Sequence, residues 1–208
     1  MKQWIFRLWI AVAAAVSCGW LPAMSVDEAE QVYLRSVERL MQGDTDIDYT
    51  ALREAYAVTR PYEAERLAGL KARADLFFRM EEWGEASRLG IEMIERNPVF
   101  AEAHMMLRGV YQAVDEPEEA AFHEAIARGL IDSVLASGDG RSESTAYAVV
   151  DDSEVRMLSR LHGWMERARS NYIRDGRAWM TLDVIHPETR TVFFRILRPL
   201  PPDDDDDD

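Results

Sequence analysis

A repeat of 34 residues constrains this 208-residue chain more than any other feature of its sequence. A shift by that length superposes Phe77 on Tyr111 and Ala86 on Ala120, so aromatic falls on aromatic and small on small. The first unit also fits the small, aromatic, alanine and proline positions of the tetratricopeptide consensus. The repeat predicts two helical hairpins, at residues 64–80 with 83–96 and 100–114 with 117–136.

Two such hairpins cannot cover both of their open faces, so the flanking segments are expected to cap them. Ser25-Val-Asp-Glu28 is a capping-box pattern, and apolar residues then recur at helical spacing until Gly43. This predicts a helix over residues 26–42, followed by a second helix over 50–58 with an acidic N-terminus.

The pattern changes from helical to extended after Ser137. Residues 145–150 are β-branched and aromatic, and 179–185 are expected to pair with 191–197 across a turn. A helix is predicted between them, from 151 to 163. We therefore expect an α+β fold that is mainly α: tetratricopeptide-like helical hairpins capped by a small C-terminal antiparallel sheet of three strands with one helix.

The N-terminal segment predicts export. Basic residues precede an apolar stretch at 8–16, and small residues follow, which is the layout of a secretory signal peptide over residues 1–25. So short a stretch does not form a permanent membrane span. Two processing routes remain open, namely cleavage after Ala23 or Ser25, and lipidation of Cys18, the only cysteine.

The formal net charge of −14 limits the partners, and the body stays acidic without the final run Asp203–Asp208. An acidic body argues against nucleic acid or an anionic membrane as the main partner. The six aspartates repel one another and follow a proline-rich segment, which predicts a disordered tail. The expected organisation is a signal peptide (1–25), a helical region (26–136), a small α+β capping region (137–198) and an acidic tail (199–208).

The most distinctive stretch is SGDGRSESTAYAVV, residues 137–150. Phosphate cradles use the N-terminus of a helix that follows the loop, whereas this loop follows a helix and leads into a strand. The order favours a structural turn, with both glycines at positive φ and with Asp139, Ser142 and Thr145 bonding local backbone groups. A ligand contact through these three side chains is the alternative.

Several segments together resemble a known family. The stretch from Gly129 to Val149, with Leu52-Arg53-x-x-Tyr56, Arg60-Pro-Tyr62 and Phe193-Phe194, resembles the exported bacterial family known as domain of unknown function number 4919. The resemblance covers about 45–197. It implies export and a single family domain, and it supplies no catalytic residues.

Two histidines of the second hairpin, His104 and His123, are candidates for chemistry. Two imidazoles near Asp139 would suit a metal site or an acid–base pair, while hydrogen-bonded structural histidines are the alternative reading. No motif assigns a cofactor or a metal. Arg60 and Tyr62 are candidates for the rim of a groove that holds an extended peptide.

These observations favour a non-enzymatic, exported cell-envelope protein, either periplasmic or anchored as a lipoprotein through Cys18. The expected partner is an envelope protein or peptide, with no nucleic acid and no integral membrane span in the mature chain. The alternative function is a hydrolase or metal-dependent enzyme with its site near His104, His123 and Asp139.

Overall fold

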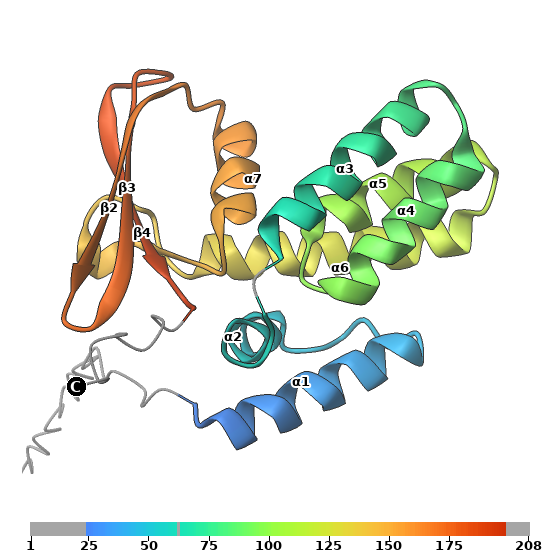
Figure 1. Ribbon diagram of the computed structural model, residues 1–208, viewed down its shortest axis with the longest axis horizontal. Helices are drawn as coiled ribbons and strands as arrows, with labels where there is room; N and C mark the ends of the chain where they lie inside the picture. Colours follow the sequence, from blue (N-terminus) through green and yellow to red (C-terminus); the bar gives the residue numbers. More distant parts are fainter. Residues whose placement is uncertain (1–23, 62, 199–208) are drawn as a thin grey trace, which may run out of the picture.

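The computed structural model describes residues 24–61 and 63–198 of the chain. This part contains seven α-helices, one short 3-10 turn and a small sheet of four strands, so the expected α+β, mainly α class is confirmed (Figure 1). Most of the predicted signal peptide and all of the acidic tail lie outside the described residues. The elements are α1 Val26–Met41, α2 Tyr49–Thr59, α3 Ala64–Arg79, α4 Trp83–Arg96, α5 Ala101–Ala113, α6 Pro117–Ala136, η1 Glu143–Thr145, β1 Tyr147–Val149, α7 Asp152–His162, β2 Glu166–Arg174, β3 Arg177–Val184 and β4 Arg190–Ile196.

The two predicted helical hairpins are present, as α3 with α4 and α5 with α6, and α4 packs on α5 between them. Ala74 and Ala86 are fully buried at the positions where the repeat requires small residues. Gly90 departs from the consensus because α5 approaches closely there. A Cβ at Gly90 would lie 2.7 Å from Cδ2 of Leu107, so a larger residue would push the two helices apart.

Helices α1 and α2 lie on one side of the hairpins, and α2 packs against α6 (Figure 1). The capping box of α1 forms as predicted: the Glu28 backbone N–H donates to Ser25 Oγ, and the Ser25 N–H donates to the Glu28 carboxylate. Asp48 accepts a hydrogen bond from the Ala51 backbone and so caps α2. The two flanking helices therefore cover part of the array, as its open faces require.

The sheet has four strands in the order β1-β4-β3-β2, instead of three. β2 is the added strand, and β1 pairs with β4 in parallel, so the expectation of an all-antiparallel sheet is corrected. The parallel pair is possible because α7 and the β2–β3 hairpin lie between β1 and β4 in the chain. This long connection lets β4 enter the sheet at the same end as β1 and run in the same direction. The predicted helix that opens at residue 151 is α7, which ends at Gly163 with φ of 66°.

One hydrophobic core joins the helical and sheet regions. Buried side chains of α1, α2 and α6 pack in the same cluster as those of β1, β3, β4 and α7. Its fully buried members include Leu52 on α2, Leu158 on α7 and Phe194 on β4. A smaller separate cluster fills the space among α3, α4 and α5. The sheet is thus anchored to the helices by shared packing, and this positions the turn between β1 and α7.

Candidate functional site

The loop after α6 bonds mainly to itself. The backbone N–H groups of Asp139 and Gly140 both donate to the Thr145 carbonyl, and the Asp139 carboxylate accepts from the Arg141 backbone. Ser142 Oγ lies 3.0 Å from Thr145 Oγ1. Hydrogen bonding from Thr145, more than from the Arg141 backbone, lowers the pKa of Asp139. Asp139 therefore bonds a local backbone group as expected, whereas Ser142 and Thr145 bond neighbouring side chains instead of backbone. All three side chains are used within the loop, as in a structural turn.

The two glycines of this loop serve different purposes. Gly140 has φ of 68°, as expected, but Gly138 is not among the glycines with positive φ. A Cβ at Gly138 would instead lie 2.3 Å from the carbonyl oxygen of Thr145. Gly138 is required because two backbone segments approach each other closely, which corrects the expectation of positive φ at both positions.

The histidines His104 and His123 form a buried pair that is joined by a hydrogen bond. Their Nδ1 atoms lie 3.0 Å apart, and His104 Nε2 lies 3.1 Å from the Pro98 carbonyl oxygen. A carbonyl only accepts, so His104 carries its proton on Nε2 and accepts at Nδ1 from the Nδ1–H of His123. Burial, and then the neighbouring His123, lowers the pKa of His104 to about 3; burial lowers that of His123 to about 4. Both rings are neutral at physiological pH.

Asp139 does not belong to this pair. His123 lies near the start of α6, whereas Asp139 follows the end of that helix, so the helix separates them by about 20 Å at its usual rise per residue. Within residues 24–61 and 63–198, no group of three or more metal-binding side chains comes together. The three residues expected to share a site therefore occupy two separate places, and the histidines have the geometry of the structural alternative.

Arg60 is also committed to contacts within the fold. Its guanidinium donates to both carboxylate oxygens of Glu30, at 2.8 and 3.0 Å, and lies over the ring of Tyr33. This joins the end of α2 to α1. Tyr62 and Cys18, the other two candidates, lie outside the described residues.

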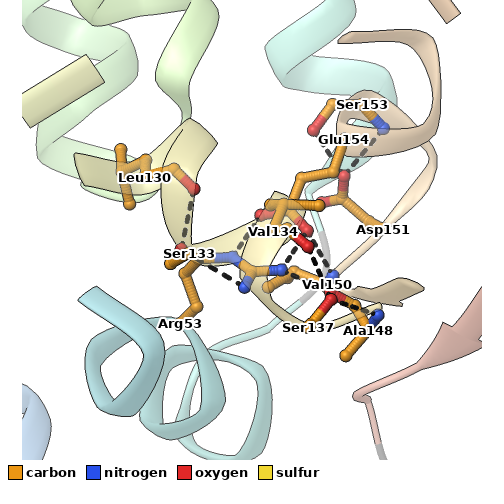
Figure 2. Close-up of polar contacts among 10 residues, drawn as sticks. All are labelled: Arg53, Leu130, Ser133, Val134, Ser137, Ala148, Val150, Asp151, Ser153 and Glu154. Carbon is orange, nitrogen blue, oxygen red and sulfur yellow. Dashed lines mark hydrogen bonds and ion pairs between the residues drawn. The ribbon is translucent and has the colours of Figure 1, made fainter. Parts of the chain in front are cut away.

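The polar centre of the molecule is a buried ion pair that the sequence did not predict (Figure 2). Arg53 of α2 is 1% exposed and Glu154 of α7 is 6% exposed. The guanidinium donates twice to the carboxylate, from Nε at 2.8 Å and from Nη2 at 2.7 Å. Arg53 belongs to the segment Leu52-Arg53-x-x-Tyr56, which carries part of the family resemblance. It lies next to Leu52 on the apolar face of α2. An arginine on an apolar helix face is the signal that could have marked it.

The pair also bonds the backbone around it, as Figure 2 shows. Arg53 Nη2 donates to the Ala148 carbonyl of β1 at 2.7 Å, and the backbone N–H of Val150 donates to Glu154 at 2.7 Å. Arg53 Nη1 also reaches the hydroxyl of Ser133 on α6. Bidentate, charge-assisted bonds of this kind fix geometry strongly. The turn from Val150 to Ser153 is therefore held from α2, α6 and α7 together.

This turn separates two cavities, and Asp151 lines both. The smaller cavity, about 250 Å³, lies between the turn and α7 on one side and α3 and α5 on the other. Most of its charged groups already form ion pairs: Lys71 with Asp75, Arg160 with the buried Glu102, and Arg156 with Asp152. The larger one is an open groove of about 630 Å³ between the turn and the β2–β3 hairpin. We call it the hairpin groove.

The hairpin groove has an apolar floor and a charged rim. Asn171 and Ile173 of β2 lie opposite Met180 and Ala178 of β3, so these four side chains share one face of the sheet. The rim carries both charges. On it, Arg169 pairs with Asp152 and Glu166, and Arg198 donates to the Arg60 carbonyl at 2.7 Å. Such a surface suits contact with a partner chain, because it offers apolar burial beside hydrogen-bonding groups. The charged residues of the rim are Asp151, Asp152, Arg169 and Arg198.

In the described part of the chain no helix combines the length and apolar character that a membrane crossing requires.

Comparisons with known proteins identify a family and nothing finer. Neither the curated proteins nor the solved structures compared with the chain give a match. A family described as a domain of unknown function, DUF4919, matches residues 24–203, which is most of the sequence. The chain therefore belongs to the DUF4919 family.

Proposed function

We propose that this protein is a non-enzymatic binding module of the cell envelope that holds an extended segment of a protein or peptide partner in the hairpin groove. The observation that carries the proposal is the groove itself, which has a volume of about 630 Å³, opens to the surface and is bordered by the edge strand β2. Grooves of this size beside a free strand suit extended chains, because backbone and side chains can both be bound.

The groove is also preorganised. Its wall at Val150–Asp152 is held by the buried pair of Arg53 and Glu154, and a second bond set fixes Asp151, which accepts from the backbone and hydroxyl of Ser153. A rigid wall lowers the entropy that is lost when a partner binds. This favours a binding role over a purely structural one for the buried charges.

The cell-envelope part of the proposal rests on the sequence. The layout of residues 1–25 is that of a signal peptide, and Cys18 offers a route to a lipid anchor. An exported chain of this kind, without a disulfide inside its mature part, depends on its apolar core and on buried polar contacts for stability.

Site-specific crosslinking tests the proposal. A photo-reactive amino acid replaces Ile173, which is 68% exposed and lines the groove. The control places the same amino acid at Leu76 of α3, an apolar residue 48% exposed and remote from the sheet in the chain. After illumination in intact cells, we expect a discrete adduct from position 173 that position 76 does not give.

The partner found in that adduct is then purified, and its affinity is measured for the full chain and for Ala178→Trp, which fills the groove floor. We expect Ala178→Trp to weaken binding at least tenfold with an unchanged circular-dichroism spectrum. An adduct equally strong at both positions, or full affinity in the Ala178→Trp protein, would remove the groove from consideration.

A further inference from the structure

The two edges of the sheet differ in a way that points to a mode of binding. At β1 the edge is closed, because the Ala148 N–H donates to Ser137 Oγ and its carbonyl accepts from Arg53. At β2 the edge is open. In residues 24–61 and 63–198, no backbone hydrogen bond joins β2 to any segment except β3. Every second residue of this strand therefore turns an unpaired N–H and C=O outward.

The open strand is unusual for its length and exposure. β2 has nine residues, and Tyr172 is the only one of them that is not exposed. A long, exposed edge is a template for another strand, and proteins that do not use such an edge commonly shorten it or cover it. β2 carries no proline and has its one irregularity at its start, between Glu166 and Ala168, so most of its length remains straight and available.

Charge indicates which strand would fit. Residues 24–165 contain 15 basic and 28 acidic residues, whereas residues 166–198 contain seven arginines and four acidic residues. The sheet is thus a basic region on an acidic protein. Arg167 on β2 makes no ion pair within the described residues. Arg195 on β4 is partly buried near Arg177 and Glu54, and burial, more than the charge of Arg177, lowers its pKa. An acidic partner would relieve this accumulation of positive charge.

We infer that the occupant of the hairpin groove is an acidic peptide segment of a partner protein, which adds to the sheet as a fifth strand along β2. The inference rests on the proposed function and specifies its partner. Alternate residues of the added strand lie toward the groove, beside Asn171 and Ile173, and the others lie on the opposite face, beside Tyr172 and Arg174. The expected pattern is apolar residues on the groove side alternating with aspartate or glutamate.

Designed peptides test this mode directly. The probe is a fluorescent peptide of alternating valine and glutamate, compared with its valine–lysine counterpart by fluorescence anisotropy on the full chain. We expect binding of the acidic peptide only, weakened by salt because exposed charges contribute. Two further peptides carry N-methyl groups on either all valines or all glutamates. Because an added strand turns only alternate N–H groups to its neighbour, one of these two should lose binding at least tenfold and the other should not.

The protein variants locate the contact. Arg167→Glu on β2 should weaken binding about tenfold, whereas Arg79→Glu, an equal charge change at the exposed end of α3, should leave it unchanged. Amide hydrogen exchange should slow in residues 166–174 when the peptide binds. An equal effect of both N-methyl patterns, or no protection of β2, overturns strand addition.

Two other outcomes overturn the inference in different ways. If the acidic peptide binds only after Asp203–Asp208 are all changed to asparagine, the chain's own tail is the occupant and the partner assignment is wrong. If no acidic peptide binds while crosslinking at Ile173 still yields a partner, the groove keeps its proposed function and the strand mode alone fails.

Discussion

Removing one member of the buried Arg53–Glu154 pair should destabilise the protein far more than its number of contacts suggests. In Glu154→Leu the Arg53 side chain, which is 1% exposed in the native protein, loses its carboxylate partner. In Arg53→Met the carboxylate is left in the same surroundings. Breaking a buried pair from one side costs about 3–5 kcal/mol, because an uncompensated charge remains out of water. Either change alone therefore removes a large share of the stability of a typical domain.

The double variant separates charge from packing. Arg53→Met with Glu154→Leu removes both charges, so the penalty for an isolated buried ion disappears. What remains is the loss of partners for the Ala148 carbonyl and the Val150 N–H, each about 1–3 kcal/mol. We expect the double variant to cost about 2–6 kcal/mol, which is below the sum of the two single effects, about 6–10 kcal/mol.

Urea unfolding followed by circular dichroism and tryptophan fluorescence measures these free energies in a double-mutant cycle. The matched control is the exposed pair Arg88 and Glu85 on α4, whose side chains are 53% and 50% exposed; Arg88→Met with Glu85→Leu should change stability by less than about 1 kcal/mol. Strictly additive single effects at Arg53 and Glu154, or single effects no larger than the control, would show that this pair does not organise the fold as argued. If a single variant does not fold, Arg53→Lys, which keeps the charge and loses the bidentate geometry, supplies the comparison.

Three further predictions follow from features of the fold. Gly138→Ala should lower the free energy of unfolding by at least about 2 kcal/mol in a thermal or urea melt, because the new Cβ meets backbone atoms. The control Gly176→Ala has positive φ but nothing within 4 Å of its Cβ, so it should cost only about 1 kcal/mol. Equal costs would contradict the close approach at Gly138. The pKa values of His104 and His123 are depressed to about 3 and 4, so only the unfolded chain takes up protons as the pH falls below about 6.5. Stability should therefore drop by about 2 kcal/mol between pH 7 and 5.5. Glutamine at both His104 and His123 should abolish most of this drop. An unchanged dependence of stability on pH in that variant would refute the role of the two histidines. Finally, cell fractionation of Cys18→Ser distinguishes the two processing routes. If lipidation anchors the protein, the variant should move from the membrane to the soluble fraction. If both proteins are soluble, cleavage after Ala23 or Ser25 is supported.

The sequence predicted the helices well because their ends carry strong local signals. Ser25 with Glu28, and Gly163 after α7, are caps whose chemistry depends on only a few neighbouring residues. The repeat gave the two hairpins for the same reason, since each apolar position recurs at helical spacing. Bounds set by local chemistry could therefore be placed to within one or two residues.

β2 was missed because nothing local marks it as a strand. Glu166–Arg174 reads ERARSNYIR, which lacks the alternation of apolar and polar residues that a half-buried strand shows. It becomes a strand only because β3 is present to pair with it. Its exposure, which removes the usual sequence pattern of a strand, also leaves its edge open to another strand.

The candidate site was missed for a related reason. Arg53 and Glu154 are 101 residues apart in sequence, and no local pattern announces that they meet. His104 and His123 could be paired from the repeat, because both belong to one hairpin. Asp139 could not be placed relative to them without knowing that α6 runs unbroken for 20 residues.

The order of the strands has a consequence for how this protein acquires its structure. β4, at residues 190–196, lies between β1 and β3 in the sheet, although it follows both of them in the chain. Strand β1 has no pairing partner until β4 is in place, and the core shared with α2 and α6 stays open until then. Long loops must close before these contacts form, which slows folding. A chain that emerges from its N-terminus will build the α3–α6 hairpins early and complete the groove last, so an intact groove reports that the whole domain has folded.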